Sequence, residues 1–146
     1  AQNLQYEDMG ALSFKQDDDY IDFALKACEK ITEDPAVHKG VFICGSGHGM
    51  DIVANKYKGV RAIMGFNRYV AAQAREHEDA NVLVLPADWL KPHEGKDIVF
   101  EFFNAQFTNE ERHSRRLKKI EELEEKHFTG NRKSSGDFGV KFEMPR

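Results

Sequence analysis

A glycine-rich stretch directly after a short apolar run is the feature that most constrains the fold. Val41-Phe42-Ile43-Cys44 has the length and composition of a buried strand, and Gly45-Ser46-Gly47-His48-Gly49 follows it without a spacer. A helix is predicted next, over 50–56. The order of strand, tight turn and helix is typical of parallel α/β sheets, in which such turns lie at the carboxyl ends of strands.

The rest of the chain repeats this alternation of strands and helices. Apolar residues recur on one helical face over 21–31, after the acidic run Asp17-Asp18-Asp19 that favours a helix start. Further strands are predicted over 59–64 and 81–85, and further helices over 69–78, 96–107 and 109–126. The pattern predicts an α/β fold with a doubly wound parallel sheet, that is, a Rossmann-like three-layer arrangement.

Length and composition favour one compact domain. The chain has 146 residues, of which 40% are hydrophobic and 32% charged, as in ordinary globular domains. We expect this domain to cover 1–128 and a C-terminal tail to cover 129–146. Residues 129–136 have the composition of a loop, whereas 137–142 alternate enough to form a short strand.

Charge and hydropathy exclude several classes of partner. A net charge of −4 argues against a general nucleic-acid binder, and the apolar runs are too short to span a membrane. The two cysteines have neither metal-ligand spacing nor the density of a disulfide scaffold, so we expect free thiols, no metal site and a cytoplasmic protein.

The glycine-rich loop is the predicted centre of the chemistry. Its glycines let successive backbone N–H groups turn toward one point at the start of the next helix, where an oxyanion or phosphate would bind. Ser46 adds a hydroxyl donor, and the helix start favours the thiolate form of Cys44, which is then a base or nucleophile. The alternative is that Cys44 merely ends a buried strand and that the glycines only form a turn.

Five ordered stretches of the chain resemble one known family, the type B ribose-5-phosphate isomerases and the related galactose-6-phosphate isomerase subunits. The resemblance covers roughly 6–120. It is carried by Glu7-Asp8-Met9-Gly10 with 17–24, by 43–50, by Ala54-Asn55-Lys56 with Gly59-Val60-Arg61-Ala62, by 74–83, and by Arg112-His113-Ser114-Arg115-Arg116.

The resemblance implies an isomerase of the pentose phosphate pathway that interconverts an aldose phosphate and a ketose phosphate without a cofactor. Cys44 corresponds to the base that moves a proton between C1 and C2, and His77 to the histidine that assists ring opening. Arg112 and Arg116 correspond to phosphate ligands that reach over from a second subunit. The implied catalytic residues are Cys44, Ser46 and His77, and the implied substrate-binding residues are Gly45, Gly47, His48, Gly49, Asn55, Glu78, Arg112 and Arg116.

The predicted last helix carries a basic cluster and a narrow apolar stripe. Arg112 and Arg116 are four residues apart, so both point the same way on a helix. Leu117, Ile120 and Leu123 form the stripe, which suits packing on a partner subunit. We therefore expect a homodimer, and pairing of dimers into tetramers stays open. We also expect His77, at the end of its helix, to lie on the same side of the sheet as Cys44.

The chain departs from the family pattern in three places. The family begins with a strand, an Asp-His pair and a helix, about thirty residues that do not precede Ala1, so an unpaired sheet edge is expected. Glu78 stands where the family has a substrate-binding Asn, and Asp88 lies near the place of a phosphate-binding Arg. These departures leave open an inactive structural or regulatory relative, or a phosphate- or nucleotide-binding module, and they leave the sugar open.

Overall fold

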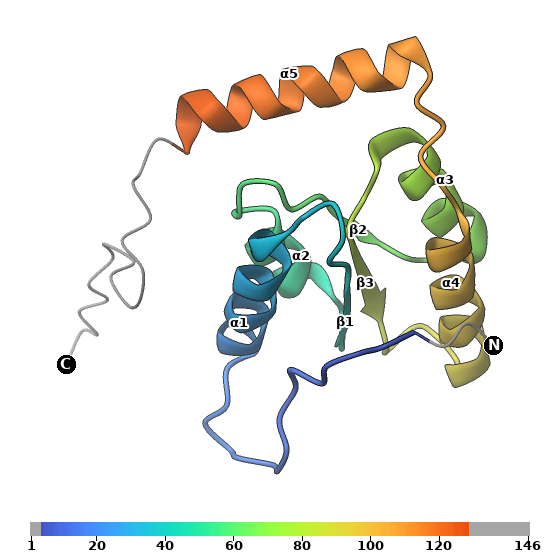
Figure 1. Ribbon diagram of the computed structural model, residues 1–146. Coiled ribbons are helices and arrows are strands. Elements are labelled where there is room, and N and C mark those ends of the chain that lie inside the picture. The colour runs from blue at the N-terminus through green and yellow to red at the C-terminus, as the bar shows by residue number, and fades with distance from the viewer. Residues whose placement is uncertain (1–3, 129–146) are drawn as a thin grey trace.

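A three-stranded parallel sheet forms the centre of the computed structural model, which describes residues 4–128 (Figure 1). The strands are β1 (Gly40–Cys44), β2 (Ala62–Met64) and β3 (Val82–Pro86), in the order β1-β3-β2. Gly40 and Ala62 both lie opposite Val82, so the three strands run in register. The expected tail over 129–146 lies outside the described residues.

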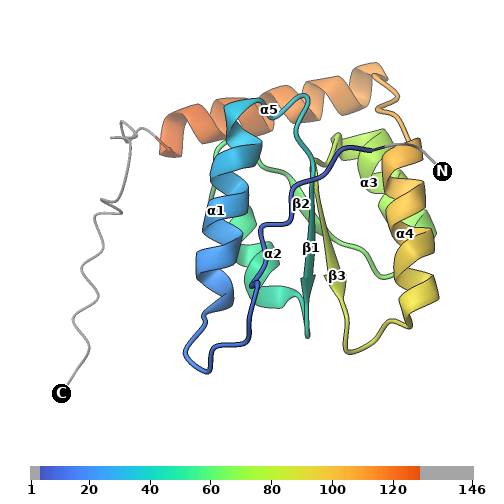
Figure 2. The ribbon, with the colours of Figure 1, turned by 60° about the horizontal axis from the view of Figure 1, so that its bottom comes forward.

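Helices cover both faces of the sheet. α1 (Tyr20–Glu33) packs against α2 (His48–Ala54) on one face, and α3 (Arg68–Glu78) packs against α4 (Pro92–Asn104) on the other (Figure 2). A fifth helix, α5 (Glu111–His127), follows α4. No helix between residues 4 and 128 has the length and apolarity needed to cross a membrane. The predicted parallel α/β sheet with helices on both faces is confirmed.

The central strand β3 joins the two halves of the core. All five of its residues are buried, and alternate side chains point to opposite faces. Val82 and Val84 pack with the α1 and α2 side, whereas Leu83 and Leu85 pack with Ile98 and Phe102 of the α4 side. This explains why 82–85 are continuously apolar in the sequence.

Local capping sets where the helices begin. The Asp19 side chain accepts a hydrogen bond from the Ile21 N–H and thereby starts α1, and the Asn67 side chain does the same at α3. α4 begins at Pro92, earlier than the predicted residue 96, because proline suits the first turn of a helix. Its end at Asn104 also precedes the predicted residue 107.

Different helix ends lie at the two ends of the sheet. The strands all end at what we call the carboxyl edge and begin at what we call the amino edge. The first residues of α1 and α2 lie at the carboxyl edge, whereas α3 ends at the amino edge and α5 crosses it (Figure 2). α5 is held there by an ion pair between Lys58 and Glu125 and by the Gly59 N–H, which donates to the Glu124 carboxylate at 3.0 Å.

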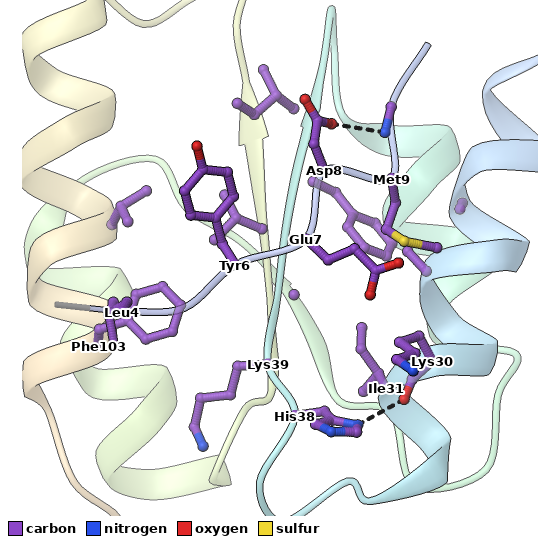
Figure 3. A pocket seen from close by; sticks show the side chains of 18 of the residues that line it. Leu4, Tyr6, Glu7, Asp8, Met9, Lys30, Ile31, His38, Lys39 and Phe103 are labelled. Carbon is purple, nitrogen blue, oxygen red and sulfur yellow. Dashed lines mark hydrogen bonds between the residues drawn. The ribbon is translucent and has the colours of Figure 1, made fainter. Parts of the chain in front are cut away.

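Strand β1 lies at an open side of the sheet. Its outer side faces a cavity of about 1210 Å³ that is also lined by α1, α4 and the extended segment 4–10 (Figure 3). Figure 3 shows this segment crossing in front of β1 from Leu4, on the side of Phe103, to Met9, on the side of α1. Among residues 4–128, no backbone hydrogen bond joins the segment to β1. The unpaired edge expected from the family resemblance is therefore present.

Candidate functional site

The glycine-rich loop lies at the carboxyl edge and connects β1 to α2. Gly47 precedes the first residue of α2 with a φ of 78°, in the left-handed region that glycine adopts readily. A Cβ atom at Gly47 would lie 2.8 Å from the Met64 Cε atom and 3.1 Å from the Val84 Cγ1 atom. Both the backbone conformation and the close packing therefore require glycine at position 47. The absence of a side chain lets the loop lie close to the ends of β2 and β3.

Replacing Gly47 by alanine tests whether the left-handed backbone at this position requires glycine. We expect Gly47→Ala to lower the free energy of unfolding by about 1–3 kcal/mol, because alanine is strained at positive φ. Gly95, within α4, is the matched control, since a Cβ there meets only the Leu85 Cδ1 atom at 3.8 Å. Gly95→Ala should raise the free energy of unfolding by about 0.5–1 kcal/mol, as expected inside a helix. Urea titration measures both, and a shift of the same sign in the two variants would contradict the assignment.

The two cysteines have different environments. Cys44 ends β1 and is half-buried beside the loop, whereas Cys28 is fully buried on the core-facing side of α1. Burial, assisted by the nearby Glu29 charge, raises the pKa of Cys28 to about 12, so this thiol stays protonated at neutral pH. Of the two thiols, Cys44 is the one that a substrate at the carboxyl edge can reach.

Two side chains from distant parts of the sequence complete the surroundings of the loop. Tyr20, the first residue of α1, covers Gly49, because a Cβ there would lie 2.5 Å from the tyrosine hydroxyl. Asp88, after β3, places its carboxylate over Gly45, where a Cβ would lie 2.9 Å from the Oδ2 atom. Tyr20 was not predicted to be in the site, and Asp88 was related to it only through the family resemblance, near the place of a phosphate-binding Arg. The available signal was topological, since α1 begins, and β3 ends, at the carboxyl edge.

Carboxylates near the loop are more numerous than the sequence indicated. Asp51 is the acidic residue adjacent to the loop in sequence, and burial raises its pKa above the ordinary value although His48 acts in the opposite direction. Asp88 adds a second carboxylate through the fold. Within residues 4–128, no three His, Cys, Asp or Glu side chains form a cluster suited to a metal ion.

His77 lies at the amino edge, so the expectation that it shares one side of the sheet with its own Cys44 is wrong. A helix that connects parallel strands runs antiparallel to them, and its last residues therefore lie where the next strand begins. β1 has five residues, which separate the two edges by about 16 Å. A histidine side chain cannot cross that distance within one chain.

His77 is instead paired with a second histidine that sequence reasoning did not place in the site. The rings of His77 and His113 are 4.3 Å apart between centroids. His113 is 1% exposed, and its Nδ1 atom lies 3.0 Å from the Thr108 hydroxyl, which in turn donates to the Glu76 carbonyl. Because that hydroxyl already donates, it accepts from His113, which fixes the proton of the ring on Nδ1. The two rings thus form an ordered pair at the amino edge.

Other predicted binding residues also lie away from the loop of their own chain. The Asn55 amide accepts from the Ala62 N–H at 2.9 Å and donates to the Ala62 and Asp51 carbonyls, so it holds the start of β2. Glu78 ends α3 at the amino edge, where its carbonyl accepts from Arg61. The predicted residues therefore fall into two groups, one from Cys44 to Gly49 at the carboxyl edge and one at the amino edge.

The predicted phosphate ligands belong to the second group. Arg112 and Arg116 are exposed on α5, and the Arg112 Nε atom donates to Glu110 at 2.9 Å. Ile120 and Leu123 on the same helix are 36% and 56% exposed, so the apolar stripe is only partly used within the chain. Neither the cavity beside β1 nor a second cavity, lined mainly by α4, has Cys44 or Ser46 among its lining residues.

Known proteins share the sequence and the fold of this chain. The model of the family described as Ribose/Galactose Isomerase matches residues 1–120. The probable ribose-5-phosphate isomerase B of Mycoplasma pneumoniae is 41% identical over 119 residues, covering 82% of this chain and 77% of its own. Ribose-5-phosphate isomerase B of Mycobacterium tuberculosis is 34% identical over 120 residues, covering 82% and 74%.

A solved structure gives the same result. Ribose-5-phosphate isomerase B from Mycoplasma genitalium, with bound ribulose-5-phosphate, superposes with a TM-score of 0.76 at 39% identity. The match covers 80% of this chain and 76% of that one. The enzyme from Thermotoga maritima superposes with a TM-score of 0.73 at 38% identity, covering 80% and 78%. The chain therefore belongs to the ribose/galactose isomerase family.

Proposed function

We propose that the chain interconverts ribose 5-phosphate and ribulose 5-phosphate, with the Cys44 thiolate as the base. The observation that carries this assignment is the half-buried thiol directly before the glycine-rich loop at the carboxyl edge, where ligands of open α/β sheets bind. The M. genitalium relative supports the substrate class, because it binds ribulose-5-phosphate. The chain is thus a cofactor-independent aldose-ketose isomerase.

The reaction is a proton transfer without net oxidation. Cys44 takes the proton from C2 of the open-chain aldose, and the electrons of the broken C–H bond form an enediolate between C1 and C2. The thiol then returns that proton to C1, while the hydroxyl proton moves from O2 to O1. We assign the transfer of this second proton to the hydroxyl of Ser46, two residues further on.

Backbone donors of the loop stabilise the enediolate. The first hydrogen bond of α2 joins the Asp51 N–H to the Gly47 carbonyl, so the preceding N–H groups have no helical acceptor. Among residues 4–128, no hydrogen bond uses the N–H groups of Gly45, Ser46 or Gly47. Fixed donors of this kind typically contribute about 3 kcal/mol each when charge develops on an oxygen in the transition state.

A complete site requires two copies of the chain. Cys44 lies at the carboxyl edge, whereas His77, Arg112 and Arg116 lie at the amino edge. In a two-fold symmetric dimer, every contact between the two copies occurs twice. If the amino edge of one copy faces the glycine-rich loop of the other, the reverse contact is therefore formed as well, and the dimer has two sites. His77 of the second copy then opens the sugar ring, and its arginines bind the phosphate. The exposed stripe on α5 supports this homodimer, in which α5 packs on the partner.

Turnover of ribose 5-phosphate tests the proposal directly. We expect ribulose 5-phosphate to form with a kcat of about 1–10³ s⁻¹, as is usual for enzymes. Galactose 6-phosphate is the comparison substrate, because the family includes isomerases of both sugars. A folded protein that produces no ribulose 5-phosphate would contradict the proposal and would favour a binding or structural role.

A further inference from the structure

Three aromatic side chains lie along the carboxyl edge, one after each strand. His48 follows β1, Trp89 follows β3 and Phe66 follows β2, so Trp89 from the central strand lies between the other two. The Trp89 ring is 5.6 Å from the His48 ring and 6.3 Å from the Phe66 ring, on which it stacks at 15°. Trp89 and Phe66 remain 56% and 49% exposed. We call these three residues the aromatic row.

The aromatic row is attached to the glycine-rich loop by the residues that precede Trp89. The Ala87 N–H donates to the Cys44 carbonyl at 2.9 Å, and the Asp88 N–H donates to the Gly45 carbonyl at 3.1 Å. These two bonds place the Asp88 carboxylate over Gly45. Among residues 4–128, no hydrogen bond or ion pair to this carboxylate is formed, so it is free to bind a ligand beside the reacting carbons.

We infer that Asp88 and the aromatic row bind the uncharged, hydroxyl-bearing carbons of the sugar phosphate. This inference rests on the proposed function. An ionised carboxylate only accepts hydrogen bonds, so it suits sugar hydroxyls and repels a phosphate. Exposed aromatic faces suit the C–H groups of the same carbons, and sites for small molecules commonly combine apolar walls with a few polar groups.

The two features also set the direction in which the substrate lies. Because Asp88 lies over Gly45, a phosphate group beside the start of the loop would be repelled. The related family has a phosphate-binding Arg near this place, and the carboxylate that stands here instead directs the phosphate away from Gly45, toward Arg112 and Arg116 of the second copy. Asp88 and the aromatic row are specificity-determining residues in this arrangement, and they take no part in the proton transfer.

The single tryptophan of the chain provides the measurement. We titrate the protein with ribitol 5-phosphate, which has no carbonyl group and cannot be isomerised, and with inorganic phosphate, and we follow Trp89 fluorescence. Asp88→Asn should weaken binding of ribitol 5-phosphate about tenfold, as expected for the loss of a hydrogen bond to a charged group, and should leave binding of inorganic phosphate unchanged. In turnover of ribose 5-phosphate, the KM should rise by a similar factor with little change in kcat.

Control variants separate binding from folding. Asp97→Asn removes an exposed carboxylate on α4 and should change neither ligand. Trp89→Ala should weaken binding of ribitol 5-phosphate about fivefold by calorimetry, whereas Trp89→Phe should retain most of the affinity, because aromatic contacts of this kind contribute about 1 kcal/mol. Tighter binding of inorganic phosphate by Asp88→Asn would overturn the inference, since the carboxylate would then face the phosphate.

The remaining outcomes distinguish this inference from the proposed function. Wild-type turnover together with unchanged binding in Asp88→Asn and Trp89→Ala overturns the inference alone. Trp89→Ala that weakens the homodimer without weakening ribitol 5-phosphate binding also overturns it, because the aromatic row would then pack on the second copy. Absence of both turnover and ribitol 5-phosphate binding overturns both proposals. Binding that depends on Asp88 in a protein without turnover supports the inference and contradicts the isomerase activity.

Discussion

Cys44→Ala should lower the kcat for ribose 5-phosphate by about 10³-fold or more, because it removes the group that transfers the proton between C1 and C2. Binding of ribitol 5-phosphate should change little, since the phosphate contacts proposed above come from α5 of the second copy. Coupled assay of ribulose 5-phosphate formation measures the first effect. Exchange of the C2 hydrogen with deuterated water, which reports proton transfer even without net turnover, should be lost in parallel.

Cys28→Ala is the matched control for this experiment. Cys28 is fully buried on α1, and its raised pKa keeps it as a neutral thiol that packs in the core. Its replacement should lower the free energy of unfolding by about 1 kcal/mol and leave kcat unchanged. If Cys44→Ala retained a kcat within tenfold of the unmodified chain, the base would have to be another group, and Asp51 and Asp88 are the carboxylates nearest to the loop.

Mixing two inactive variants should restore activity. Cys44→Ala loses the base at the carboxyl edge, and His77→Asn loses the ring-opening group at the amino edge. In a mixed dimer, the intact Cys44 of one chain meets the intact His77 of the other, so one of the two sites is complete. Random exchange makes half of the dimers mixed, which gives about a quarter of the unmodified activity under two-fold symmetry. Refolding equal amounts together and assaying ribose 5-phosphate turnover measures the recovery.

A chain that carries both substitutions controls for nonspecific recovery. When it is mixed with Cys44→Ala, every site lacks Cys44, and no activity should return. Differently tagged chains show by mass whether mixed dimers have formed. If mixed dimers form and remain inactive, His77 and Cys44 do not act in one shared site, and the two-copy arrangement is refuted.

The order of the strands and helices could be predicted from the sequence, because each element depends on residues close together in the chain. The buried strand 41–44, the glycine-rich turn and the following helix are fixed by composition over about ten residues. The continuous apolar run over 82–85 likewise indicated a strand. Element ends were less accurate, as α4 shows, because the proline at its first turn and the contacts of its last residues both affect its length.

Only part of the candidate site could be predicted from the sequence. The sequence itself places Cys44, Ser46, Gly47, His48 and Gly49 together, since they are contiguous. It gave no indication of Tyr20, and it pointed to Asp88 only through the family resemblance, because each residue reaches the loop through packing across the sheet. The prediction for His77 was wrong, because α3 runs antiparallel to the strands and its last residues therefore lie at the amino edge.

The sequence by itself thus determined the alternation of strands and helices, the position of the glycine-rich loop and the family resemblance. These depend on local periodicity and on contiguous motifs. Only the tertiary structure decided the strand order β1-β3-β2, the contacts of Asp88 and Trp89 at the carboxyl edge, and the place of His77 and α5 at the amino edge. The physical reason is that these features depend on contacts between residues distant in sequence. Such contacts are determined by the direction in which each strand and helix runs and by how they pack in the folded sheet.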